Sequence, residues 1–153
     1  MDTSVKSFVN LENARVEEQR RSMERIQARG ECPFCEKNLR CEHTKPILKE
    51  GRFWILTENE WKYEAAKLHF LLIYRKHAEK LSELDSFAGT EMFGMIKWLE
   101  NEYQIASGAI GIRFGDMKLN GGTVRHLHVH VIVPYGPEDP LFQVARFRMS
   151  AKK

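Results

Sequence analysis

The chain is organised around the stretch Arg125-His126-Leu127-His128-Val129-His130-Val131-Ile132-Val133-Pro134, in which histidines alternate with aliphatic residues. Successive side chains on a β-strand point to opposite faces. As a strand, this segment places His126, His128 and His130 on one face. The opposite face then carries aliphatic side chains suited to a core, namely Leu127, Val129, Val131 and Val133. The pattern therefore predicts a strand that is one wall of a reaction site.

The spacing of the histidines argues against a metal site made by this strand alone. Residues two apart on a strand are separated by about 6.6 Å, and residues four apart by about 13 Å. A neighbouring pair can share one ion, but the outer two barely reach it, so at least one imidazole is free. A neutral imidazole is a nitrogen nucleophile that can attack phosphorus and form a phosphoramidate, which a second acceptor then resolves.

The turn before the strand suits a phosphate group. Asn120-Gly121-Gly122-Thr123 leads directly into the histidine segment. Glycines let backbone N–H groups approach an anion closely, and Thr123 adds a hydroxyl. A glycine-rich turn alone is a weak signal, but its position before three alternating histidines makes phosphoryl or nucleotidyl transfer the favoured chemistry.

Length and composition indicate one globular domain of a reducing compartment. The chain has 153 residues and is 42% hydrophobic, and its net charge of +3 comes from 24 basic and 21 acidic residues. This balance suits a phosphorylated ligand but is too weak to predict a nucleic-acid partner. We find no apolar run of the ~20 residues that span a bilayer, and the three cysteines are an odd number, so we predict a cytoplasmic protein without a membrane segment.

Local patterns predict an α+β fold. Residues 10–29 favour a largely exposed helix that ends at Gly30, and residues 36–51 are polar and loop-like. Strands are expected at 52–57, 68–74, 108–114 and in the histidine segment, while 58–67 is either a loop or a short helix. Asp85 or Ser82 is expected to cap a helix that runs to about residue 104, and 115–123 is expected to be a turn.

These elements together predict an antiparallel sheet of about five strands with one long packed helix and an additional N-terminal helix. We divide the chain into an N-terminal helical extension, residues 1–30, and a catalytic domain, residues 31–153.

A Cys-x-x-Cys pair lies upstream at Cys32-Pro33-Phe34-Cys35. Two thiolates supply half of a tetrahedral zinc site, and histidines are available to complete it. Inert buried thiols are the alternative, and a thioredoxin-like redox role is less favoured because no strand directly precedes the pair. The nearby Cys41 and His43 are a rival source of ligands.

The segment from His126 to Ile132 resembles the signature of the histidine triad (HIT) superfamily of nucleotide hydrolases and transferases. The resemblance extends from about Cys32 to Pro134, and the segment from Leu68 to His77 is similar to the family strand that ends in Pro-Lys-x-His, with Tyr74 in place of the proline.

The resemblance implies a role for each candidate residue. His128 would be the nucleophile that carries the nucleotidyl group, and His130, Thr123 and the backbone at Gly122 would bind the phosphate. Asn59 is the best match to the ribose-binding residue. In zinc-containing members the Cys-x-x-Cys pair joins two histidines, which implies a structural zinc ion held by Cys32, Cys35, His77 and His126.

The favoured function is therefore hydrolysis of a nucleoside phosphate linkage, of the dinucleoside polyphosphate or nucleoside phosphoramidate type, by a homodimer of the HIT kind. Two alternatives remain open. One is nucleotidyl transfer to phosphate or a sugar phosphate. The other is a non-catalytic nucleotide-binding protein, because polar residues usual in the family are missing near Gly115 and Gly122.

Overall fold

A five-stranded antiparallel sheet forms the centre of the computed structural model, which describes residues 7–150. Its strands lie in the order β1-β2-β3-β5-β4. Their bounds are Ile47–Glu50 for β1, Trp54–Glu58 for β2, Ala66–Tyr74 for β3, Ala109–Ile112 for β4 and His128–Pro134 for β5. The predicted α+β class and antiparallel sheet are confirmed. Residues 1–6 of the predicted N-terminal extension and residues 151–153 of the predicted catalytic domain lie outside the described residues.

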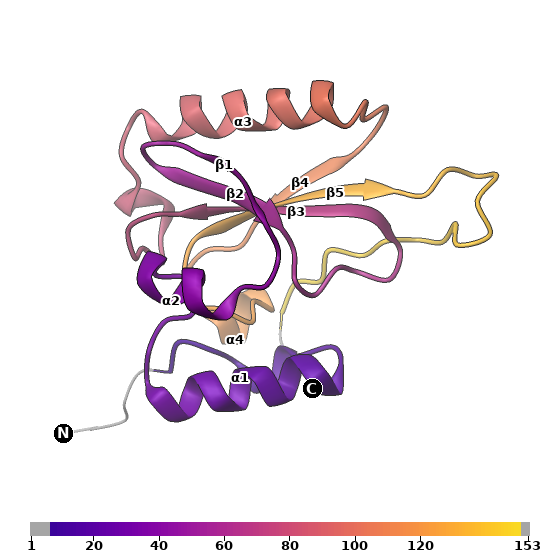
Figure 1. Ribbon diagram of the computed structural model, residues 1–153. Helices are drawn as coiled ribbons and strands as arrows, with labels where there is room; N and C mark the ends of the chain where they lie inside the picture. Colours follow the sequence, from indigo (N-terminus) through magenta and orange to yellow (C-terminus); the bar gives the residue numbers. More distant parts are fainter. Residues whose placement is uncertain (1–6, 151–153) are drawn as a thin grey trace.

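Helices cover both faces of the sheet (Figure 1). The long helix α3, Ala88–Glu102, lies along one face. On the other side lie α1, α2 and α4, together with the C-terminal segment, which runs out past β5 and returns beneath the sheet. These three helices span Glu17–Arg29, Glu36–Glu42 and Met117–Asn120, and two short 3-10 helices span Leu11–Asn13 and Leu81–Glu83.

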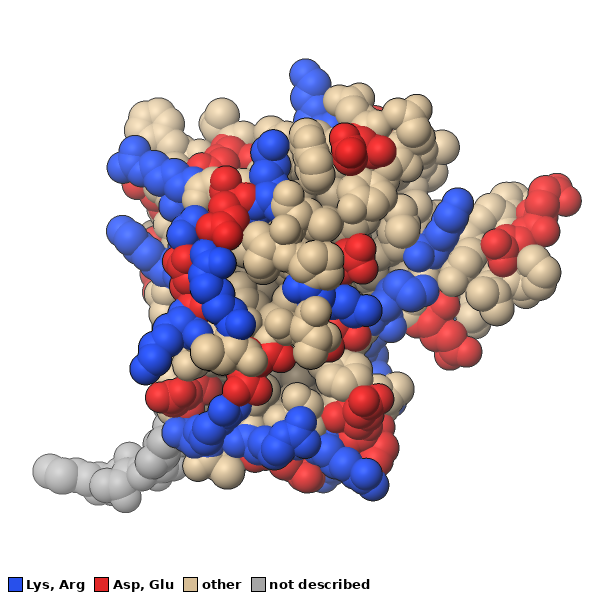
Figure 2. Space-filling view, in the orientation of Figure 1, with Lys and Arg blue, Asp and Glu red and all other residues tan. Residues whose placement is uncertain are grey.

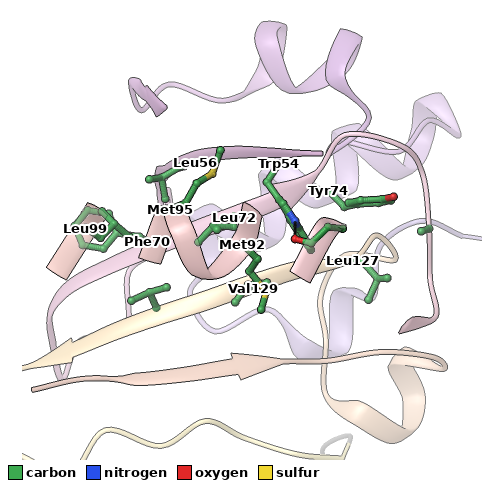
Figure 3. Close-up of a cluster of buried hydrophobic side chains, with 13 residues drawn as sticks. Trp54, Leu56, Phe70, Leu72, Tyr74, Met92, Met95, Leu99, Leu127 and Val129 are labelled. Atoms are coloured by element: carbon green, nitrogen blue, oxygen red, sulfur yellow. Dashed lines mark hydrogen bonds between the residues drawn. The ribbon is translucent and has the colours of Figure 1, made fainter. Parts of the chain in front are cut away.

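The main hydrophobic core lies between the sheet and α3 (Figure 3). Leu127, Val129 and Val131 contribute to it from the histidine segment, as their alternation predicts. They meet side chains from the neighbouring strands and from α3, including Leu72, Phe70, Met92, Met95 and Leu99. The opposite side chains of the segment, His126, His128 and His130, are also buried, so both faces of this strand are covered.

The strand β5 lies between β3 and β4, and it begins later than expected, at His128. Its register with β3 pairs Ile73 with His128 and Leu71 with His130. Leu127 still accepts a hydrogen bond from the Tyr74 backbone N–H, so the chain stays close to β3 just before the strand. This position brings His126 next to the end of β3.

The N-terminal helix is shorter than the predicted 10–29 and begins at Glu17. Asn10 caps a separate 3-10 turn, and the buried Asn13 side chain donates to the carbonyls of Met117 and Gly122, which holds this segment against the 115–123 loop. Gly30 ends the helix in the left-handed conformation, as predicted. Lys, Arg, Asp and Glu side chains intermingle along α1 at the lower edge of the molecule (Figure 2), which fits a solvated helix.

The expectation of a loop at 36–51 is wrong, because this stretch contains α2 and the edge strand β1. Leu39 is the one buried side chain of α2, and it packs beside Ile55, Leu71 and Ile73 on the sheet. A single apolar residue among charged ones gives no helical periodicity, which explains the error. The 115–123 turn likewise contains the short helix α4. Of the stretch 58–67, residues 59–65 form turns rather than a helix, and the two ends belong to β2 and β3.

Glu91 connects α3 to the turn between β1 and β2. Its carboxylate accepts backbone N–H groups of Arg52, Phe53 and Trp54, each at 2.9 Å. We expect Glu91→Ala to lower the free energy of unfolding by roughly 1–3 kcal/mol, because these donors lose a charged acceptor. Urea unfolding measures the change, and Glu100→Ala, an exposed site on the same helix, should stay within about 0.5 kcal/mol of the intact chain. Equal losses in both variants would contradict the assigned role of Glu91.

Candidate functional site

Four candidate metal ligands meet where the loop before α2 approaches the end of β3 and the start of the histidine segment. The ligand atoms of Cys32, Cys35, His77 and His126 all lie within 4.8 Å of one another. The Cys32 Sγ lies 3.3 Å from the His126 Nδ1, and the Cys35 Sγ lies 3.6 Å from the His77 Nδ1. Two sulfurs and two imidazole nitrogens are the donors of a closed tetrahedral zinc site.

The outer nitrogens of both histidines face acceptors. The His126 Nε2–H donates to the Tyr74 carbonyl at 2.5 Å, which leaves the Nδ1 lone pair directed at the thiols. The His77 Nε2 lies 3.6 Å from a Glu79 carboxylate oxygen. Metal-bound histidines commonly hold their second N–H in this way, which fixes the tautomer that can bind. The hydrogen-bond partners of the two histidines therefore fit a bound metal ion, as the four donor atoms do.

Without a cation, the buried Cys32 thiol keeps its proton. Burial raises the pKa of the Cys32 thiol to about 12, and the neighbouring Cys35 adds to this increase. A metal ion reverses this effect, because it stabilises the thiolate directly.

The rival ligands Cys41 and His43 are not part of the cluster. The His43 Nε2 lies 2.7 Å from the Thr57 hydroxyl, and Cys41 is exposed. Among the described residues, the cluster formed by Cys32, Cys35, His77 and His126 is the group with metal-ligand spacing.

His128 has one ring nitrogen engaged and one directed away from the backbone. Its Nδ1–H donates to the His126 carbonyl at 2.6 Å, so the lone pair resides on Nε2. The Phe34 ring packs edge-on against the imidazole with 5.0 Å between ring centres. Burial lowers the pKa of His128 to about 4, which keeps the ring neutral at neutral pH. A fixed tautomer and a neutral ring are what a nitrogen nucleophile requires.

His130 is held by His69, a residue outside the predicted set of site residues. The Tyr63 backbone N–H donates to the His69 Nδ1 at 3.2 Å, so His69 carries its hydrogen on Nε2. That N–H donates to the His130 Nδ1 at 2.9 Å. The hydrogen of His130 is therefore on Nε2, as a phosphate-binding donor requires. Burial lowers the pKa of His130 well below its ordinary value, with the nearby His128 and His69 contributing.

A cavity of about 400 Å³ opens beside these histidines. The sheet, the glycine turn and the C-terminal segment contribute to its wall, and α1 and α2 also line it. Its lining includes His128, His130, Thr123, Asn59, Met23 and Leu39. A pocket of this size accommodates a small organic ligand.

Two of the predicted ligand contacts have protein partners. The Gly122 N–H donates to the Asn120 side chain at 2.8 Å, and Gly122 does not line the cavity, whereas Thr123 does. Asn59 lines the cavity, and its Oδ1 accepts the Trp61 N–H while its Nδ2 donates to the His69 Nδ1 at 3.3 Å. Thr123 is thus open to the cavity, and Asn59 supports the ring that holds His130.

Residues outside the predicted set complete the wall of the site. Tyr63 lies parallel to the His130 ring, and Phe147 meets it edge-on with ring centres 5.2 Å apart. Arg113 places its Nη1 3.4 Å from the His130 Nε2. These residues come from a loop, the end of β4 and the C-terminal segment, so no sequence spacing indicates that they meet.

His69 should make stability depend on pH. Burial lowers its pKa from 6.5 to about 3, so the folded chain keeps this ring neutral while the unfolded chain protonates it. Its contribution to stability is complete above pH 6.5 and is lost as the pH falls toward 3. Between pH 7 and pH 5 this loss is about 2 kcal/mol.

We expect His69→Gln to show a correspondingly smaller decrease over the same pH interval. Urea unfolding of both proteins at pH 7 and pH 5 measures the difference. An unchanged decrease in the variant would show that His69 is not kept neutral by the fold.

The fold and the site together define an α+β protein whose strand β5 presents His128 and His130 to a cavity. Residues 61–136 match the HIT domain, and the chain belongs to the HIT family. No curated protein matches the chain.

Several solved structures share the fold at low sequence identity. A histidine triad nucleotide-binding protein from Candida albicans has a TM-score of 0.57 at 19% identity, covering 76% of this chain and 87% of its own. A HIT family hydrolase from Clostridium thermocellum has a TM-score of 0.52 at 24% identity, with coverages of 71% and 94%. A zinc-bound histidine triad family protein from Mycobacterium smegmatis has a TM-score of 0.53 at 20% identity, with coverages of 72% and 78%.

The described part of the chain contains no helix that is long and apolar enough to cross a bilayer.

Proposed function

We propose that this protein is a nucleotide hydrolase that cleaves a nucleoside phosphate linkage through a covalent nucleotidyl-His128 intermediate. One observation carries the proposal. Of the three alternating imidazoles, His126 faces the cysteine cluster and His130 is bound by His69, while the Nε2 lone pair of His128 has no partner within the described residues. His128 also lines the cavity, so the free nitrogen belongs to the ring that a substrate can meet.

The reaction proceeds in two displacements at the same phosphorus. In the first, the His128 Nε2 forms a P–N bond to the nucleoside phosphate while the bond to the leaving group breaks, and the leaving group takes up a proton. In the second, water forms a new P–O bond, the P–N bond breaks, and a nucleoside monophosphate departs. The His126 carbonyl accepts the Nδ1–H throughout and stabilises the positive charge that the ring gains in the first step.

The phosphate oxygens are bound by donors beside His128. His130 offers its Nε2–H, and Thr123 offers a hydroxyl from the turn before the strand. The backbone at Gly122 shapes this turn. Asn59, which donates to His69 from the wall of the cavity, would contact the nucleoside. Donors fixed in this way stabilise the negative charge of the transition state without reorganising during the reaction.

We propose that Cys32, Cys35, His77 and His126 hold a structural zinc ion. The zinc-bound relative from Mycobacterium smegmatis supports this choice of metal, as do the donor atoms and their outer hydrogen-bond partners. Four protein ligands leave no position for substrate, so the ion would connect the loop before α2 to β3 and to the histidine segment. Every chemical step above is performed by the chain's own residues.

We also propose that the chain is divided into an N-terminal extension and a catalytic domain, and that it forms a homodimer. The 1–30 extension packs its helix over the cavity of the 31–153 domain, since Met23 and Ile26 line that cavity. Homodimerisation is proposed through the open edge of the sheet, where β4 is the last strand and Ile110 is exposed.

Hydrolysis is tested by a panel of dinucleoside polyphosphates and nucleoside phosphoramidates, with products identified in buffers with and without phosphate. We expect a nucleoside monophosphate in both buffers. A nucleoside diphosphate formed only with phosphate would instead establish nucleotidyl transfer. Tight nucleotide binding with no product from any substrate would establish a non-catalytic nucleotide-binding protein.

A further inference from the structure

Four arginines line the cavity, and three of them, from distant parts of the sequence, lie close enough to repel one another. Arg15 precedes α1, Arg113 follows β4, and Arg148 lies in the C-terminal segment. Two of them belong to regions on either side of the 61–136 match to the HIT domain. The convergence therefore arises from this chain's own N-terminal and C-terminal segments.

Tyr63 holds two of these side chains. The Arg15 guanidinium lies over the Tyr63 ring, with 4.1 Å from its carbon to the ring centre. The Arg113 Nη2 lies 3.4 Å from the Tyr63 hydroxyl. The Arg113 guanidinium also stacks on Phe147 at 3.7 Å and donates to the Arg148 carbonyl. Packing on both sides fixes the position of these charges before any ligand arrives.

The three positive charges have no acidic partner. Among residues 7–150, no carboxylate forms an ion pair within 4.0 Å of Arg15, Arg113 or Arg148. Glu42, Glu60 and Glu64 also line the cavity. Glu42 pairs with Arg29, Glu60 accepts from Thr44, and within the described residues Glu64 forms no ion pair with any of the three arginines.

The cost of this arrangement is visible at Arg15. Its pKa is lowered by burial, and the charges of Arg113 and Arg148 lower it further. Unpaired like charges that are packed together disfavour the folded state, and a bound anion would offset this cost.

The free N–H groups point to where that anion lies. The Nε and Nη2 of Arg113 are used by the Arg148 carbonyl, but its Nη1 faces the His130 Nε2, which itself carries a hydrogen. Two donors that face each other without an acceptor mark a position for an anionic oxygen. Within residues 7–150, the Arg15 side chain donates one hydrogen bond to the Trp61 carbonyl, and the Arg148 side chain donates one to the Asn13 carbonyl. Both guanidinium groups keep further N–H groups.

We propose that Arg15, Arg113 and Arg148 form a subsite for the phosphate groups that lie beyond the one transferred to His128. As a statement about substrates, this rests on the proposed function: the preferred leaving group carries phosphates of its own, as in a polyphosphate chain, and is not a neutral or cationic amine. Guanidinium groups suit this task because they bind phosphate oxygens in pairs and stay charged. The N-terminal extension and the C-terminal segment thus select the leaving group.

The subsite is tested by calorimetric titration with inorganic tripolyphosphate and orthophosphate, with the metal content of the chain measured before and after. We expect the intact chain to bind tripolyphosphate at least about ten-fold more tightly than orthophosphate. Arg15→Gln and Arg148→Gln should each weaken tripolyphosphate binding roughly ten- to hundred-fold, the range for a charge-assisted hydrogen bond. Arg20→Gln removes the same charge from exposed α1 and should change the affinity less than about three-fold.

Two results would overturn the subsite: unchanged tripolyphosphate affinity in both variants with intact thermal unfolding, or an equal loss in Arg20→Gln. His128→Ala separates this proposal from the catalytic one, since it should abolish turnover while tripolyphosphate binding still depends on Arg15 and Arg148. If no substrate is turned over while binding still follows Arg15 and Arg148, the proposed function fails and the subsite stands. If turnover depends on His128 but tripolyphosphate binding is unchanged by substitution of the arginines, the subsite fails and the proposed function stands.

Discussion

His128→Ala is expected to lower turnover of the best substrate by at least about a thousand-fold, which corresponds to ~4 kcal/mol in the activation free energy. The reason is that no other group of the site can form the covalent intermediate. His126 directs its Nδ1 at the cysteines, and His130 has its Nδ1 bound by His69 and a hydrogen on Nε2. Steady-state kinetics on the substrate identified by the panel measures the effect.

The loss must come from chemistry and not from unfolding. The His128 side chain makes one hydrogen bond, to the backbone carbonyl of His126. His128→Ala should therefore keep its metal content and its nucleotide affinity within a few-fold of the intact chain. Imidazole added to the variant should restore part of the rate, because the cavity beside the removed ring admits a molecule of that size. A variant that keeps more than about a tenth of the intact rate would contradict a nucleophilic role for His128.

Removal of the metal is expected to have the second large effect. Cys32→Ser should lose the zinc ion, and the free energy of unfolding should fall by about 4 kcal/mol at zinc concentrations a thousand-fold above Kd. The physical reason is that the proposed ion would bind the folded arrangement of four residues from three separate segments, an arrangement that the unfolded chain lacks. Elemental analysis and urea unfolding, with and without a chelator, measure both quantities.

The matched control for the metal site is Cys41→Ser. Cys41 is an exposed thiol on α2 that lies outside the cluster, so this variant should retain about one zinc per chain and the stability of the intact protein. Zinc loss in Cys41→Ser or His43→Ala, together with full zinc in His77→Ala, would show that the nearby residues are the ligands instead.

Strict alternation made the histidine strand predictable. Period two fixes which side chains share a face, and the structure places Leu127, Val129 and Val131 in the core as that period requires. The Cys-x-x-Cys pair gave an equally local signal. Its two histidine partners were expected only through the family resemblance, and they lie 42 and 91–94 residues from the cysteines along the chain.

The remaining parts of the site depend on the register of the sheet and on the path of the termini. His69 reaches His130 because β3 and β5 pair Leu71 with His130, and a sequence does not specify that register. Arg148 reaches the cavity because the C-terminal segment folds back beneath the sheet (Figure 1). Helix α2 has no helical pattern of apolar residues, because only Leu39 among its residues is buried. Long-range placement, and not local propensity, decides each of these cases.

The central claim is that His128 carries the nucleotidyl group during turnover. It is tested most directly by mixing the intact chain with a substrate labelled in the nucleoside phosphate, stopping the reaction in alkaline denaturant that preserves P–N bonds, and mapping the label by peptide mass. The account predicts one label per chain at most, on His128, and none in His128→Ala. Label on His126 or His130, or turnover of the same substrate without any labelled chain, would contradict it.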